Sequence, residues 1–180
     1  MDKKLMVISG PSGAGIGPVL SAVFARREDT GTALPVTARK PKAGEQDGAG
    51  LRFYDLEGWN ALKESGDLLE WTEFAGNDYG TSRREIEAVL AAGRHVLLSL
   101  PVQRAALLKH NYPRALCVYL EPSPAVLRQR YEALSHSPLE LAVRLDQAER
   151  ERALSDFCDA RVSSDDLDAA AAALEALLDR

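Results

Sequence analysis

The residues with the clearest chemical potential form a glycine-rich loop close to the N-terminus. The segment GPSGAGIG at 10–17 places four glycines in eight positions, after the apolar run 5–9 and before residues with helical spacing. A loop between a strand and a helix can point its backbone N–H groups inward, and the helix adds the positive end of its dipole. We therefore expect a phosphate-binding loop. Its members would be Gly10, Ser12, Gly13, Gly15 and Gly17.

The same loop lacks the side chains that would act on a bound phosphate. The usual pattern, G-x-x-x-x-G-K-[ST], supplies a lysine for the β- and γ-phosphates and a hydroxyl for magnesium. Ile16 stands at the lysine position, and neither Gly17 nor Pro18 carries a hydroxyl. Loss of such a charge typically slows phosphoryl transfer by roughly two or more decades. By itself, the loop is compatible with phosphate binding and with a turn that binds nothing.

Strands that alternate with helices predict the fold class. Apolar runs at 95–100 and 115–120 predict two further buried strands, and helical patterns follow at about 124–134 and 139–154. This alternation predicts an α/β fold with a parallel sheet flanked by helices.

The middle of the chain interrupts this alternation. We predict one domain with a core of about 1–33 and 95–180 and an inserted lobe of about 34–94. Within the lobe, Ser82 and Glu85 predict a capping box at the start of a helix.

Composition narrows the class of protein. The chain has 180 residues, is 46% hydrophobic and carries a formal net charge of −5, which suits one well-packed domain and not a general nucleic-acid binder. The N-terminal apolar run is too short to span a membrane and lacks a cleavage site, so we expect a cytoplasmic protein without membrane insertion. The histidines and cysteines lack metal-site spacing, so no metal site is expected.

Five segments resemble the guanylate kinase family, in the family's own order. GPSGAGIG resembles the family's GPSGAGKG, and TARKPKAGEQDG at 37–48 resembles TTR-x-PR-x-GE-x-DG. GDLLEWTEFAGNDYGTS at 66–82 resembles G-x-LLEW-x-x-x-x-GN-x-YGT, which is a specific block. GRHVLLSLPVQRA at 93–105 and SSDDLDAA at 163–170 resemble GRDVLLEIDVQGA and NDDL-x-x-A. The resemblance covers nearly the whole chain.

This resemblance implies a P-loop nucleoside-monophosphate-kinase fold with a GMP-binding lobe and a small lid at about 134–144. The family's reaction converts ATP and GMP to ADP and GDP. A carboxylate can accept from the N1–H and amine of guanine, while cations and a phenol hydroxyl can bind the monophosphate. On this basis the resemblance assigns GMP and phosphate contacts to Arg39, Lys42, Glu70, Tyr79 and Thr81, and a lid arginine to Arg144.

The chain departs from the family where the chemistry takes place. Pro101 replaces the acid of the LEID-type strand, and Leu134 replaces a lid arginine. Arg104 stands where the family usually has glycine, Ser99 stands at the glutamate of that strand, and Leu51 replaces a tyrosine. With the losses at Ile16 and Pro18, no catalytic residue can be assigned.

The main hypothesis is therefore a pseudoenzyme that binds a guanine nucleotide or a phosphorylated ligand, with little or no phosphoryl transfer from ATP. One alternative is an active nucleotide kinase in which Lys40, Arg52 or Arg104 replaces the lost charge, and only then would ATP and Mg²⁺ take part. Another is a protein- or phosphopeptide-interaction module, because Pro35 resembles the scaffold-protein domains of this family. The oligomeric state stays open.

Overall fold

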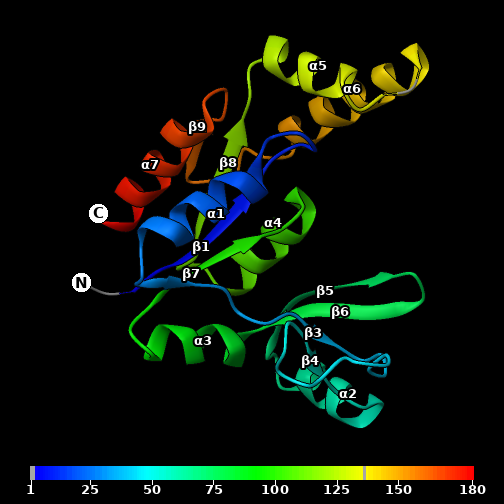
Figure 1. Ribbon diagram of the computed structural model, residues 1–180. Coiled ribbons are helices and arrows are strands. Elements are labelled where there is room, and N and C mark those ends of the chain that lie inside the picture. Colours follow the sequence, from blue (N-terminus) through cyan, green and yellow to red (C-terminus); the bar gives the residue numbers. More distant parts are fainter. Residues whose placement is uncertain (1–2, 136) are drawn as a thin grey trace.

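The chain folds around two sheets. The computed structural model describes residues 3–135 and 137–180 (Figure 1). The larger sheet has five strands in the order β2-β7-β1-β8-β9, and every neighbouring pair is parallel. Its strands are β1 Leu5–Ser9, β2 Thr30–Gly31, β7 His95–Ser99, β8 Leu116–Glu121 and β9 Ala160–Ser163.

Helices cover both faces of this sheet. Met6 and Ile8 of β1 pack on one face with α1 and α7, and Leu5 and Val7 pack on the other with α3 and α4. Every residue of β1 is buried, as expected for a strand covered on both sides. The predicted α/β fold, with a parallel sheet flanked by helices, is confirmed. These helices are α1 Ile16–Arg26, α3 Arg83–Ala91, α4 Val102–Asn111 and α7 Leu167–Leu178.

The smaller sheet forms a lobe of its own in the middle of the chain (Figure 1). It has four strands in the order β4-β3-β6-β5, with β5 and β6 as an antiparallel hairpin. The helix α2, Leu56–Glu64, buries Trp59 against Val36 and Leu68 beneath the sheet. The strands are β3 Val36–Thr37, β4 Arg52–Phe53, β5 Leu68–Phe74 and β6 Asn77–Ser82.

The start of α3 differs from the predicted capping box. Ser82 is the N-cap residue, but its side chain accepts no helical N–H. Its hydroxyl donates to Asp67, whose other carboxylate oxygen accepts the N–H of Arg84 at 3.1 Å. Glu85 pairs with Arg52 at 3.0 Å instead of reaching back to the cap. The prediction was wrong because Asp67 is distant in sequence but lies beside the helix end.

Two helices form a hairpin that projects from the sheet (Figure 1). They are α5, Pro124–Glu132, and α6, Pro138–Ala153, each capped by a serine side chain. Leu127 and Tyr131 of α5 pack against Ala148 of α6. Of the segment 134–144, predicted as a lid, residues 138–144 form the first half of α6, and residue 136 lies outside the described residues. No helix in the described ranges is long and apolar enough to cross a membrane.

Candidate functional site

The glycine-rich loop joins the buried strand β1 to α1. Gly13 and Gly15 both have a φ of 81°, a left-handed backbone that favours glycine. A Cβ on Gly10 would lie 2.7 Å from the carbonyl oxygen of Leu120, so glycine is required there too. The helix begins at Ile16, and therefore the loop is shorter than the predicted 10–17. The first N–H groups of α1 have no helical partner, which gives the loop the backbone of a phosphate cradle.

The side chains around this loop do not complement a polyanion. The cavity at the loop has a volume of about 340 Å³, and its lining includes Ser99, Pro101 and Glu151. Among the described residues that line it, Glu151 is the only charged one. Ile16 lines the cavity too, and it also packs against the core beneath α1 and α7. A carboxylate without a cation would repel the phosphates of a bound nucleotide.

Arg130 of α5 lies against the loop, where its guanidinium makes hydrogen bonds to backbone carbonyl groups. Its Nη1 donates to the carbonyl oxygen of Gly13 at 2.8 Å, and its Nη2 donates to that of Ser164 at 2.7 Å. The guanidinium fastens the helical hairpin to the loop through backbone carbonyl groups.

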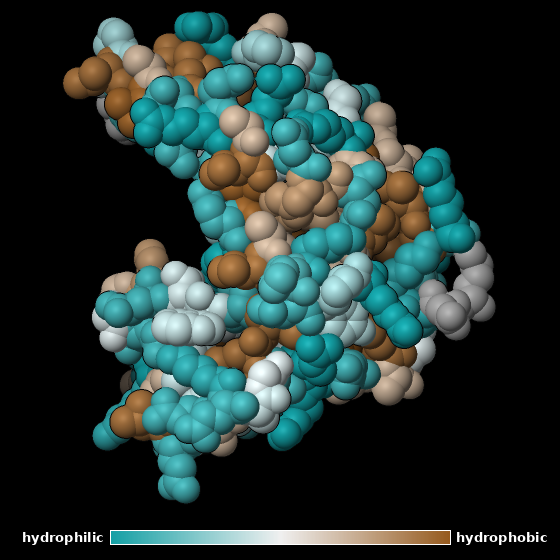
Figure 2. Space-filling model, turned by 180° about the vertical axis from the view of Figure 1, so that it is seen from behind, coloured by the Kyte–Doolittle hydropathy of each residue, from teal (hydrophilic) through white to brown (hydrophobic). Residues whose placement is uncertain are grey.

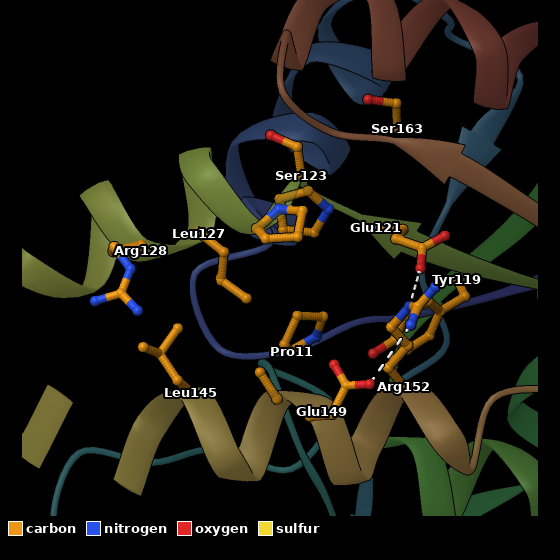
Figure 3. A pocket seen from close by; sticks show the side chains of 13 residues that line it. Pro11, Tyr119, Glu121, Ser123, Leu127, Arg128, Leu145, Glu149, Arg152 and Ser163 are labelled. Carbon is orange, nitrogen blue, oxygen red and sulfur yellow. Dashed lines mark hydrogen bonds and ion pairs between the residues drawn. The ribbon is translucent and has the colours of Figure 1, made fainter. Parts of the chain in front are cut away.

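A second cavity, of about 560 Å³, lies between the loop and the helical hairpin (Figure 3). Its charged lining residues are Glu121, Arg128, Glu149 and Arg152. Arg152 pairs with Glu121 and, at 3.5 Å, with Glu149 (Figure 3). In the part of the chain that the structure describes, Arg128 is the one cation of this cavity that makes no ion pair. The two acidic and two basic side chains of this cavity therefore cancel in net charge, which leaves little positive charge to attract a triphosphate.

A larger cleft separates the core from the lobe, and Figure 2 shows the molecule deeply notched there. Its volume is about 1090 Å³. From the lobe, the predicted ligand residues Arg39, Tyr79 and Thr81 line it, and from the core Pro101 and Arg104 do. The cleft thus brings together three of the five residues assigned to GMP or phosphate.

Arg39 is held in place on the lobe wall of the cleft. Its Nε donates to the hydroxyl oxygen of Tyr79 at 3.0 Å. Its two terminal nitrogens donate to Glu45 at 2.6 and 2.7 Å. The Arg39 hydrogen bond lowers the pKa of Glu45 to about 2, helped by the backbone N–H of Lys42, so this carboxylate stays ionised at neutral pH. The arrangement leaves the proton of the Tyr79 hydroxyl free to donate to a phosphate.

Lys42 does not join this group. Its backbone N–H donates to Glu45 at 2.7 Å, but its side chain is exposed. Among the described residues that line the cleft, Lys42 is absent. Of the predicted pair of phosphate-binding cations, only Arg39 is among the described residues that line the cleft.

Glu70 lies behind the cleft wall, and its side chain has no exposed surface. One carboxylate oxygen accepts the Thr81 hydroxyl and the Nη2 of Arg104, the latter at 2.8 Å. The other oxygen accepts the Nε of Arg104. Thr81 pairs directly opposite Glu70 in the β5–β6 ladder, which explains their contact. The predicted guanine acceptor is thus paired within the protein.

Arg144, the predicted lid arginine, is not among the described residues that line these three cavities. Arg144 donates to Glu140 Oε1 at 3.1 and 2.8 Å, one turn earlier in α6. It also lies 6.0 Å from the centre of the Tyr131 ring. Leu134, at the position of the lost lid arginine, is exposed just beyond α5.

Comparisons with known proteins identify the family. The family model described as guanylate kinase matches residues 2–180. The guanylate kinase of Parasynechococcus marenigrum is 38% identical over 176 residues, which are 97% of this chain and 97% of that protein. The guanylate kinase of Thermosynechococcus vestitus is 36% identical over 174 residues, 96% of this chain and 91% of that protein. This chain belongs to the guanylate kinase family.

Solved structures agree on the fold. The guanylate kinase from Anaplasma phagocytophilum has a TM-score of 0.64 and 22% identity, and the match covers 98% of this chain and 85% of that one. The shikimate kinase from Bacteroides thetaiotaomicron has a TM-score of 0.52 and 15% identity, with 98% and 99% covered. Both likenesses place the chain among P-loop kinase folds.

The side chains at the loop differ from the guanylate kinase pattern, and they do not fit a bound Mg²⁺–ATP. A bound Mg²⁺–ATP would need a cation beside the β- and γ-phosphates and oxygen ligands for the metal. Ile16, Gly17 and Pro18 supply neither, and Pro101 supplies no carboxylate. No group of three or more potential metal-ligating side chains occurs in the described ranges.

The three cations considered as replacements also lie elsewhere. Arg104 pairs with Glu70, and Arg52 pairs with Asp47 and Glu85. Lys40 is exposed, and none of the three lines the cavity at the loop. None of these three residues therefore brings a cation to the described lining of the loop cavity.

Proposed function

We propose that the protein binds a phosphorylated small molecule of the nucleoside-monophosphate class in the cleft between core and lobe, with little or no phosphoryl transfer from ATP. The observation that carries this proposal is the contrast between two cavities. Arg39 and Tyr79 line the cleft, whereas Glu151 alone brings charge to the described lining of the loop cavity.

Binding in the cleft is supported by the geometry of the Arg39–Tyr79 pair. Glu45 fixes the guanidinium from behind, so that little conformational entropy is lost when a ligand arrives. A charged donor and a phenol hydroxyl side by side can make short, charge-assisted hydrogen bonds to one phosphate group.

Weak transfer is supported by the loss of several groups that would act on the same transition state. Phosphoryl transfer depends almost entirely on positioning and on charge stabilisation. The positions at issue are Ile16, Pro18, Pro101 and Leu134. One such loss is tolerable in principle, but four remove most of the electrostatic stabilisation.

An active guanylate kinase is the second candidate, and the comparisons favour it over a pseudoenzyme. The curated relatives are named guanylate kinases and match nearly the full length of the chain. Overall identity is set by the whole chain, however, whereas phosphoryl transfer depends on a few positions. We prefer weak or absent transfer because the residues at those few positions differ from the family pattern.

Nothing in the comparisons supports a phosphopeptide partner, and a cytoplasmic location stays a prediction.

Two measurements test the proposal. Nucleoside monophosphates should raise the melting temperature in a concentration-dependent way, because a ligand of the folded state stabilises it. A coupled assay for GDP formed from ATP and GMP should show turnover well below one per second, under the ordinary enzyme range. If no monophosphate stabilises the protein, the binding part is wrong, and ordinary turnover would favour the active kinase.

A further inference from the structure

Arg104, which lines the cleft from the core, forms an ion pair with the buried Glu70 behind the cleft wall. Glu70 is completely covered, while the side chain of Arg104 keeps a quarter of its surface exposed, 25% against 0%. Arg104 lines the cleft and Glu70 does not. A ligand in the cleft therefore meets a guanidinium where the family pattern has a carboxylate.

The guanidinium still has donors to offer. Arginine carries five N–H donors and no acceptor. Glu70 accepts from Nε and Nη2 of Arg104, and no acceptor for Nη1 lies within the described residues. At least the two N–H groups of Nη1 remain for a ligand.

The position of Arg104 is fixed by its helix. Arg104 lies in the first turn of α4, three residues after Pro101 at the N-cap. At the other end of α4, Asn111 donates to the backbone oxygen of Leu69 at 2.8 Å, next to Glu70 on β5. The helix is thus attached to the lobe strand at both ends, which holds the guanidinium at the cleft.

We infer that Arg104 selects a monophosphate ligand whose far end carries hydrogen-bond acceptors, such as carbonyl oxygens, in place of the donor edge of guanine. This inference rests on the proposed binding of a monophosphate in the cleft. In the orientation that the family resemblance implies, guanine would place its N1–H and amine against the N–H groups of Arg104, and two donors cannot pair. A base with a carbonyl at the amine position can accept from Arg104, in the way that acceptor atoms of nucleic-acid bases accept from arginine N–H groups.

Three purine monophosphates that differ at one position provide the test. Xanthosine 5′-monophosphate has a carbonyl where GMP has its amine, and inosine 5′-monophosphate has only hydrogen. By calorimetric titration of the wild-type chain, we expect the xanthosine ligand to bind at least about tenfold more tightly than GMP, with the inosine ligand between them. Equal affinities, or tighter binding of GMP, would contradict the inference while leaving monophosphate binding intact.

Arg104→Gly restores the family residue and frees the carboxylate of Glu70. This variant should reverse the order, so that GMP becomes the tightest ligand. Arg104→Lys keeps a charge beside Glu70 but loses the planar fork, and it should reduce the preference for the xanthosine ligand even if Arg104→Gly does not fold. Arg150→Gly is a matched helical control at an exposed arginine outside the cleft, and it should leave the order unchanged.

The outcomes distinguish the role of Arg104 in ligand selection from the proposed binding of a monophosphate. An unchanged order of affinities in both Arg104 variants would mean that the ion pair is only structural, and the inference would be wrong. Failure of all three monophosphates to bind the wild-type chain would overturn the inference together with the proposed function.

Discussion

Arg39 and Lys42 carry the same charge and lie three residues apart, yet only Arg39 lines the cleft. The difference comes from Glu45, which binds the guanidinium of Arg39 but takes only a backbone N–H from Lys42. At the scale of single residues, the proposed phosphate site therefore has one cation from this pair, Arg39.

This difference predicts unequal effects of two alanine substitutions. Arg39→Ala should weaken monophosphate binding about ten- to a hundredfold, because a hydrogen bond to a charged group contributes about 1.5–3 kcal/mol. Lys42→Ala should change the dissociation constant less than about twofold, since exposed charges contribute little. Calorimetric titration measures both. Equal losses in the two variants would mean that Lys42 reaches the ligand after all.

Ile16 offers a second test at this scale. Ile16→Lys restores the loop cation, but Pro18 and Pro101 still provide no metal ligand. We therefore expect the rate of GDP formation to rise by less than about tenfold, measured in a coupled assay against Ile16→Met as an uncharged control. A gain of about a hundredfold or more would show that the lysine alone was missing.

At the scale of elements, β7 carries a buried histidine that ties it to the N-terminus. His95 Nδ1 accepts the backbone N–H of Lys4 at 3.0 Å, and Nε2 lies 3.6 Å from Asp29. Burial lowers the pKa of His95 below its ordinary 6.5, and nearby Lys3 lowers it further, whereas Asp29 opposes the shift. The folded state therefore keeps this ring neutral.

The lowered pKa predicts how stability changes with pH. Below the ordinary pKa of 6.5 the unfolded chain binds a proton at His95 that the folded chain does not, so the free energy of unfolding should fall as the solution is acidified from about pH 7 to 5. Asp29, whose pKa is lowered from 3.8 chiefly by Arg27, adds to this only in more acidic solution. Urea unfolding at several pH values measures the slope.

The matched variant is His95→Asn, whose amide oxygen can accept the same N–H without titrating. It should flatten the slope between pH 7 and 5. A slope as steep as that of the wild-type chain would assign the effect to other groups.

At the scale of the whole molecule, much of the fold could be predicted from the sequence because local patterns carry it. The buried strand 5–9, the glycine loop and the helix near 124–134 follow from apolar runs and turn residues, and the structure has them within a few residues. The hairpin strand β6 escaped prediction because its sequence, NDYGTS, is polar and gains its stability from pairing with β5.

The candidate site in the cleft was less predictable, because its side-chain pairs also join residues that are distant in the sequence. Motif comparison places Arg39, Tyr79 and Glu70, but it cannot tell which side chains pair with one another. Glu45 lies in a recognised motif, so its role could have been suspected. The pairing of Arg104 with Glu70 joins residues 34 positions apart, and only the packing of α4 on β5 brings them together.

The central claim is that the fold has lost the usual chemistry of its family, and one measurement tests it most directly. Purified wild-type protein is assayed for GDP formed from ATP, GMP and Mg²⁺, with a coupled enzyme system and a no-GMP control. The account predicts turnover well below one per second at saturating substrates. Turnover of about one per second or faster would contradict it and would establish an active kinase whose missing charge is supplied in another way.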